Sequence, residues 1–164
     1  MNKIQITSVH TMTETEKQAA CRWRYPTPYD LYNLPAYEKL SADCTGFCNP
    51  EKYENYRAFY DADTFIGYTN MYKKENFVFI GIGVSPDMCS KGYGQLILEK
   101  SSEIAGRIYA GLPMMLEVRT WNTRAIACYS KSGFEICGRP FTQVTGAGSG
   151  EFIRMIKSSS PEYK

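Results

Sequence analysis

The sequence predicts an α/β (α+β) fold with a central mixed, mostly antiparallel sheet of about seven strands and helices on both faces. Two observations support this prediction. Three strand-like segments follow one another in meander order between residues 53 and 84, with polar turns between them. Two helical segments then alternate with further strands, and strands joined through helices lie parallel in one sheet.

The N-terminal part of the chain is expected to contain one strand and two helices. Alternating side chains predict a strand over 4–9, and acidic residues in a first turn favour a helix over 13–22. A second helix is expected over 29–40, interrupted or bent at Pro35. Residues 41–50 are expected to form a loop.

The remaining elements follow the periodicity and the turn residues. The glycine-rich segment 145–150 is expected to connect the last two strands, either as a loop that arches over a binding pocket or as a mobile hairpin tip. The predicted elements are strands over 53–60, 64–72, 77–84, 114–120, 134–141 and 151–157, a helix over 92–109, and a helix over 123–132 with Asn122 as its N-cap.

Length and charge limit the classes of function. At 164 residues the chain is long enough to bury a core, so we expect one domain over 1–157 and a loose tail over 158–164. The net charge is +2 and includes no long basic run, so no nucleic-acid partner is expected. No segment has the apolar length of a signal peptide or a membrane span, which predicts a cytoplasmic protein without a membrane partner, as a monomer or homodimer.

The six cysteines and the single histidine argue against a metal site and a histidine-based triad. Cys44 and Cys48 have a suggestive spacing, but no second pair accompanies them and His10 is the only histidine. Free thiols are expected, because disulfide frameworks are typical of shorter secreted chains.

The segment from Val84 to Gly94 carries the main functional signal. A predicted strand ends at Pro86, and the sequence Lys91-Gly92-Tyr93-Gly94 opens into a helix. Such a loop aims unpaired N–H groups and the positive end of the helix dipole at one point, which suits a pyrophosphate, although glycines there are also ordinary turn chemistry. Gly81 and Gly83 leave one face of the strand bare, either for a backbone-like ligand or for close packing.

Further residues downstream complete a pattern that is strongest from about Phe77 to Phe134. The pattern consists of Val84-x-Pro86, Lys91-Gly92-Tyr93-Gly94, Glu117-Val118-Arg119, Asn122, Ala125-Ile126, Tyr129 and Gly133-Phe134. These residues resemble the GNAT superfamily of acyl-CoA-dependent N-acetyltransferases, and Leu116–Phe134 is similar to the corresponding segment of the ribosomal-protein alanine N-acetyltransferases. The resemblance implies acetyl-CoA as co-substrate, no metal, and direct attack by a primary amine of a small molecule or a peptide in a ternary complex.

The resemblance also implies which residues bind the cofactor. Cys89 departs from the family, whose loop usually has Arg or Gln at that position; Lys91 either supplies part of the missing charge or is a solvated loop lysine. The implied cofactor-binding residues are Ile82, Gly83, Val84, Cys89, Ser90, Lys91, Gly92, Tyr93, Gly94, Gln95, Asn122 and Tyr129.

Two residues are candidates for the catalytic groups. Tyr129 lies two helical turns beyond Asn122, and a tyrosine hydroxyl can hand a proton to a leaving thiolate as general acid; such a tyrosine can also be a packed helix aromatic. Glu117 matches the base of the ribosomal-protein enzymes, or else forms an ordinary ion pair with Arg119 on the same strand face. The family resemblance leaves a second route open, because many of its members deprotonate the amine through water chains or backbone carbonyls.

The acceptor site is the least defined part of the prediction. Trp23, Tyr25, Tyr29, Asp30 and Tyr32 either wall an acceptor pocket, with Asp30 attracting a cationic amine, or pack the first helices against the sheet. A non-catalytic acyl-CoA sensor and a nucleotide-binding protein are the alternative functions. The latter lacks the Gly-x-x-x-x-Gly-Lys-Ser/Thr pattern of a P-loop.

Overall fold

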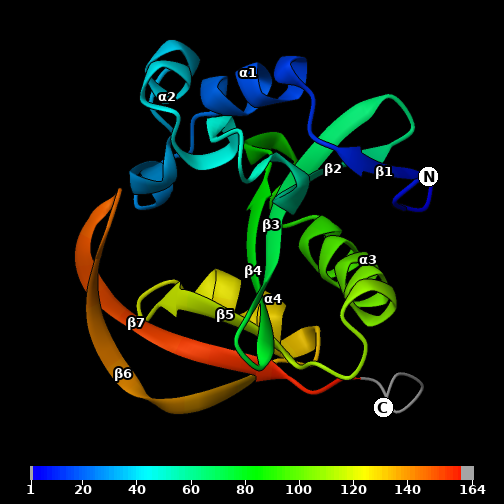
Figure 1. The fold of residues 1–164 in the computed structure, drawn as a ribbon, viewed down its shortest axis with the longest axis vertical. Coiled ribbons are helices and arrows are strands. Elements are labelled where there is room, and N and C mark those ends of the chain that lie inside the picture. Colours follow the sequence, from blue (N-terminus) through cyan, green and yellow to red (C-terminus); the bar gives the residue numbers. More distant parts are fainter. Residues whose placement is uncertain (1, 160–164) are drawn as a thin grey trace. The chain divides into compact units, whose positions relative to one another are not determined.

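The computed structural model describes residues 2–159 and contains a seven-stranded sheet in the order β1-β2-β3-β4-β5-β7-β6 (Figure 1). Strands β4 and β5 pair in parallel, with Val78 opposite Met114. The pairs β1–β2, β2–β3, β5–β7 and β6–β7 are antiparallel. The predicted mixed, mostly antiparallel sheet is therefore confirmed. Most of the predicted tail, residues 160–164, lies outside the described residues.

The elements have the following bounds. The strands are β1 (Ser8–Thr11), β2 (Tyr56–Asp61), β3 (Thr64–Lys74), β4 (Phe77–Val84), β5 (Met114–Arg119), β6 (Glu135–Thr145) and β7 (Gly148–Lys157). The α-helices are α1 (Glu14–Arg22), α2 (Tyr37–Asp43), α3 (Tyr93–Ile108) and α4 (Thr123–Lys131), and short 3-10 turns occupy Tyr29–Tyr32, Gly46–Cys48, Tyr53–Asn55 and Pro86–Met88.

The chain divides into two compact units, and strands β3 and β4 contribute residues to both. The first unit runs to Asn70 and also includes Ile82–Tyr93. The second unit comprises Met71–Gly81 and the chain from Gly94 onward. The loop predicted to bind a pyrophosphate therefore belongs to the first unit up to Tyr93, whereas Glu117 and Tyr129 belong to the second.

Helix α1 starts at a capping box in the first unit. Thr13 is the N-cap: its hydroxyl accepts from the Glu16 N–H, and the Glu16 carboxylate accepts from the Thr13 N–H. The helix then buries Ala20 and Cys21 against Phe47. This apolar contact fixes α1 in the core of the first unit, because a nine-residue helix is marginal without tertiary packing.

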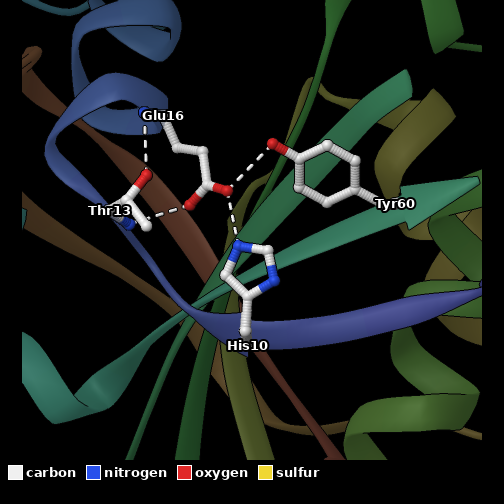
Figure 2. A network of polar contacts seen from close by, with 4 residues as sticks. All are labelled: His10, Thr13, Glu16 and Tyr60. Atoms are coloured by element: carbon white, nitrogen blue, oxygen red, sulfur yellow. Dashed lines mark hydrogen bonds and ion pairs between the residues drawn. The ribbon is translucent and has the colours of Figure 1, made fainter. Parts of the chain in front are cut away.

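The Glu16 carboxylate lies in a closed polar network (Figure 2). Its Oε2 accepts from the Thr13 N–H at 2.8 Å, while its Oε1 accepts from the Tyr60 hydroxyl at 2.9 Å and lies 2.5 Å from His10 Nε2. Burial by itself would raise the pKa of Glu16, but the hydrogen bonds from Thr13, His10 and Tyr60 together lower it below its usual value. Glu16 is thus a structural carboxylate that stays charged.

The second unit is dominated by the long β6–β7 hairpin, the orange and red strands of Figure 1. Strand β7 pairs with β5 on its other side, so that Arg154 lies opposite Glu117 and Phe152 lies opposite Arg119. Phe141 of β6 lies opposite Phe152, and their rings stack at a centroid distance of 6.1 Å. Because side chains alternate along a strand, these residues share one face of the sheet.

Helices α3 and α4 belong mainly to the second unit and approach each other closely. A Cβ at Gly94 would lie 2.9 Å from Cys128 Sγ, so only glycine leaves room for α4 at the start of α3. Farther along α3, Ser102 donates to the Leu98 carbonyl and accepts from Lys157 Nζ at 3.1 Å. Gly94 therefore has a packing role in addition to its predicted place in the loop.

The structure refines three of the predicted elements. The helix expected over 29–40 is interrupted at Pro35: a 3-10 turn and α2 lie on either side of this proline, which disfavours helix in the residue before it. The first strand is Ser8–Thr11 rather than 4–9, because pairing with β2 places Ser8 opposite Tyr60. The segment 145–150, expected to be a loop or a hairpin tip, is a hairpin tip at which Thr145 lies opposite Gly148.

Candidate active site

The loop after β4 has the backbone geometry of an anion-binding turn. Ser90 and Gly92 both adopt positive φ, at 61° and 92°. Within the described residues, the N–H groups of Ser90, Lys91 and Gly92 donate to no protein acceptor. Turns with left-handed residues gather successive N–H groups into a concave anion site. The loop therefore fits a phosphate group through its backbone, and Gln95 follows it in the first turn of α3.

The end of β4, where the loop begins, is held by side chains of the first unit. The Tyr25 hydroxyl donates to the Val84 carbonyl at 2.6 Å, and the Cys89 thiol lies 3.8 Å from the same oxygen. The Ser85 N–H donates to the Ile66 carbonyl at 2.8 Å. Tyr25, predicted in the acceptor pocket, thus supports the strand end from which the loop starts.

Two more residues of this region have a packing explanation. A Cβ at Gly83 would lie 2.7 Å from the ring of Tyr68, so this glycine accommodates an aromatic side chain of β3. The Tyr93 hydroxyl donates to Asp61 at 2.7 Å, and that hydrogen bond raises the pKa of Tyr93. Ile82 precedes Gly83 in β4. Cofactor binding by these residues stays a prediction.

The other residues predicted for the acceptor pocket lie in two places of the first unit. Trp23 packs against Phe65 and Tyr68, with ring centroids at 5.1 and 6.0 Å, as the packing interpretation expects. Tyr29, Asp30 and Tyr32 form a 3-10 turn in which Asp30 is exposed. The Asp30 carboxylate is therefore on the surface, where it can meet a cation.

In the second unit, Asn122 and Tyr129 lie at the two ends of α4. Asn122 is buried and its side chain accepts from the Ala125 N–H at 3.2 Å, which confirms it as the N-cap. Tyr129 is half-buried, and its ring meets Phe134 edge-on at a centroid distance of 6.4 Å. Tyr129 is therefore not sealed in the core, which is a condition for a general acid.

Glu117 is held by two partners that sequence reasoning did not find. Its Oε1 lies 3.2 Å from Arg154 Nε, and its Oε2 accepts from Gln143 Nε2 at 2.9 Å. The expected pair with Arg119 is wrong, because Arg154 lies directly opposite Glu117 while Arg119 points to the hairpin tip. The register of β5, β6 and β7 brings these residues together, and no local sequence pattern reports that register.

Residues 2–159 contain neither a cluster of metal-ligating side chains nor a membrane-spanning helix. In that part of the chain, no three His, Cys, Asp or Glu side chains gather closely enough to hold a metal ion. None of its helices combines the length and the apolar character required to cross a bilayer. All six cysteines are free thiols, as predicted.

Comparisons with known proteins assign the chain a family and a fold. The profile of the acetyltransferase (GNAT) family matches residues 17–134. No curated protein sequence matches the chain. Among solved structures, the chain is similar to the Escherichia coli ribosomal-protein-S18-alanine N-acetyltransferase, with 24% identity over 93% of this chain and 94% of that one and a TM-score of 0.64.

Two structures with bound ligands superpose somewhat better. AAC(6')-Ib in complex with ribostamycin and coenzyme A gives a TM-score of 0.71 at 17% identity, covering 94% of both chains. Spermidine N-acetyltransferase from Vibrio cholerae, in complex with CoA and spermine, gives 0.71 at 12% identity, covering 93% of this chain and 95% of that one. At such identities the likeness concerns the fold.

Proposed function

The chain belongs to the acetyltransferase (GNAT) family, and we propose that it transfers an acetyl group from acetyl-CoA to a primary amine of a small molecule or a peptide. One observation of the structure carries the cofactor half of the proposal. The loop after β4 turns through Ser90 and Gly92 and leaves three successive N–H groups without a protein acceptor among the described residues. Such donors suit the pyrophosphate of coenzyme A.

Loop side chains contribute less than the backbone to this binding site. Cys89 directs its thiol toward the Val84 carbonyl, and Lys91 is exposed. Neither side chain is built into a rigid anion clamp. The loop therefore relies on peptide N–H groups, with Lys91 adding a screened charge.

The catalytic half of the proposal uses Glu117 and Tyr129. The amine nitrogen forms a bond to the thioester carbonyl carbon while Glu117 takes the amine's proton, directly or through a water molecule. The carbon–sulfur bond then breaks, and the Tyr129 hydroxyl gives its proton to the departing thiolate. A carboxylate and a half-buried tyrosine are the residue types that these two proton transfers require.

The acceptor is proposed only by chemical class. The similar structures include a ribosomal-protein-S18-alanine N-acetyltransferase and a spermidine N-acetyltransferase in complex with CoA and spermine, so both peptide and small polyamine amines suit this fold. The exposed carboxylate of Asp30 favours a cationic amine. A panel of amines, rather than one substrate, is the appropriate assay.

The first experiment is a thermal-shift panel with acetyl-CoA, free CoA, ATP and NAD. A ligand at 100 times its dissociation constant stabilises the fold by about 2.7 kcal/mol, which is a clear shift of Tm. We expect a shift with both CoA species, followed by thiol release when a suitable amine is added. A shift with ATP or NAD and none with CoA would refute the proposal.

A non-catalytic acyl-CoA sensor gives a different result in the second step. It binds CoA in the thermal-shift panel but releases no thiol with any amine, and the substitution Tyr129→Phe changes nothing that can be measured. The two functions are thus separated by the same two assays.

A further inference from the structure

Arg119 is a buried cation whose side-chain hydrogen bonds, within residues 2–159, all go to the tip of the β6–β7 hairpin. Only 6% of its surface is exposed, and it forms no ion pair within residues 2–159. Its Nη1 donates to the Ser149 carbonyl at 3.3 Å, and its Nη2 donates to the Gly148 carbonyl at 3.2 Å and the Thr145 hydroxyl at 3.4 Å. A buried charge is costly without such partners, so this arrangement needs a reason.

The neighbouring side chains are arranged around the guanidinium. It lies over the ring of Phe152, with Cζ 4.9 Å from the ring centroid. A Cβ at Gly150 would overlap Arg119 Nη1 and lie 3.1 Å from Cζ. The φ of Gly150 is not positive, so its backbone conformation does not require glycine. The Arg119 side chain, which occupies the space that a Cβ would need, accounts for a glycine at this position. The absent side chain at Gly150 is an observation independent of the hydrogen bonds.

The same hairpin also reaches Glu117. Gln143 lies two residues before Thr145 on β6 and opposite Gly150 on β7. Its Nε2 donates to Glu117 Oε2 at 2.9 Å. Arg119 and Glu117 are two residues apart on β5 and share one face of the sheet. Arg119 binds the hairpin tip, and the hairpin in turn binds Glu117 through Gln143.

We propose that Arg119 is a positioning residue: it clasps the tip of the β6–β7 hairpin and thereby, through Gln143, orients the Glu117 carboxylate toward the acceptor amine. This inference rests on the proposed function, in which Glu117 is the base. Arginine suits the task because its planar fork reaches two carbonyls at once, which a lysine ammonium on a flexible stem does not reproduce. Displacement of a catalytic group by about 1 Å can cost up to about 10²-fold in rate.

The test measures kcat and the KM for acetyl-CoA separately in three variants of the whole protein. Arg119→Ala removes the clasp, Gln143→Ala removes the link, and Gly150→Ala displaces the guanidinium without changing it. We expect each variant to lower kcat by about tenfold, with the KM for acetyl-CoA within about twofold of wild type. Arg119→Lys should regain little of the loss. Arg139→Ala, an exposed arginine on the same hairpin, is the matched control.

Double variants make the test specific. If Gly150 and Gln143 act only through the clasp, adding Gly150→Ala or Gln143→Ala to Arg119→Ala should cost no further rate. Additive losses would overturn the proposal, as would wild-type kcat in Arg119→Ala. A variant that fails to fold is recognised by its Tm, and Gln143→Ala, at a half-buried surface position, then carries the test.

Hydrogen exchange separates a failure of this inference from a failure of the proposed function. Arg119→Ala should increase exchange of the amides of 146–150 whether or not the protein is an enzyme. If exchange rises and Glu117→Gln lowers the rate while Arg119→Ala does not, the positioning role is wrong and the acetyltransferase stands. If wild-type protein transfers no acetyl group to any amine, the proposed function fails and the positioning role fails with it.

Discussion

The two units each hold a glutamate in a polar network, and the two networks differ in how they are built. The Glu16 side chain is 6% exposed and is held by a backbone N–H, a tyrosine and a histidine (Figure 2). The Glu117 side chain is 19% exposed and is held by the ends of two long side chains, Gln143 and Arg154. A fixed, buried carboxylate serves stability, whereas a partly exposed one with adjustable partners retains the access that proton transfer needs.

The same contrast applies to two tyrosines. Burial and the hydrogen bond to Glu16 raise the pKa of Tyr60 to about 12, which makes it a poor proton donor. Tyr129 is half-buried at the end of α4 and packs edge-on against Phe134. Substitutions in the first network should therefore change stability and leave turnover alone, and substitutions in the second should do the reverse.

Tyr129→Phe is expected to have the largest effect of these substitutions. Loss of a general acid should lower turnover by roughly 10- to 1,000-fold and leave CoA affinity nearly unchanged. Turnover is measured by thiol release and affinity by titration calorimetry. Tyr60→Phe is the matched control and should retain wild-type turnover. Normal turnover in Tyr129→Phe would return this tyrosine to a packing role and break the comparison.

Glu117→Gln should lower the rate by roughly 10- to 100-fold near neutral pH and recover partly at high pH, where more of the amine is already neutral. The measurement is a rate profile from pH 6 to pH 10. Arg154→Gln is the control, because it removes the ion pair and keeps the carboxylate. An equal deficit at every pH, or an equal loss in Arg154→Gln, would assign the effect to the lost pair.

The sequence predicts contacts between residues that are close together in the chain better than contacts between residues that are far apart in it. The Thr13 to Glu16 capping box is local, and so is the Asn122 N-cap, so helix starts at both places could be expected from residue type and spacing. Glu117 and Tyr129 were candidates because they belong to one short motif. Gln143 and Arg154 lie 26 and 37 residues from Glu117, and only the sheet register brings them to it.

The glycine-rich hairpin tip shows the same limit. Residues 145–150 have the composition of a loop, yet the ladder continues to Thr145 and Gly148. Gly150 is a glycine because the Arg119 side chain occupies the space beside it, and that reason is visible only in three dimensions. A high glycine content indicates that the backbone of a segment is conformationally free, but it does not show which side chain packs against a given glycine.

Glu16→Gln tests the structural side of the comparison. It should lower the free energy of unfolding by roughly 1–3 kcal/mol at pH 7, because a neutral amide cannot accept every hydrogen bond of the buried carboxylate. Since the folded-state pKa of Glu16 is lowered, its stabilisation is present above the ordinary value of about 4.3 and is lost as the pH falls through the folded value. Urea unfolding between pH 3 and pH 7 measures both the loss of stability at pH 7 and its dependence on pH.

The acid side of that profile gives the check. Below about pH 4.3, wild type should lose stability more steeply than Glu16→Gln as the pH falls. In this range the unfolded wild-type protein binds a proton at Glu16 that the folded protein does not, and a glutamine has no proton to take up. Thiol-release activity of Glu16→Gln at pH 7 should remain that of wild type. Parallel stability curves, or a loss of turnover with an unchanged fold, would show that the two networks are not separate in function.

Cys89→Arg is expected to have the smallest effect, because the loop binds through its backbone. The Cys89 thiol lies 3.8 Å from the Val84 carbonyl and cannot make the charge-assisted contact that arginine offers a diphosphate. We expect the substitution to tighten CoA binding by roughly 1 kcal/mol, the scale of one partly exposed charge-assisted contact. The gain should shrink as salt rises, because exposed charges are screened. Calorimetric titration of both proteins at low and high salt measures this gain in affinity.

Lys91→Ala, which removes the lysine cation of the loop, should weaken binding by a similar amount and with the same salt dependence. If Cys89→Arg binds no better at low salt, position 89 does not lie beside the diphosphate, and the backbone site begins at least one residue farther along the loop.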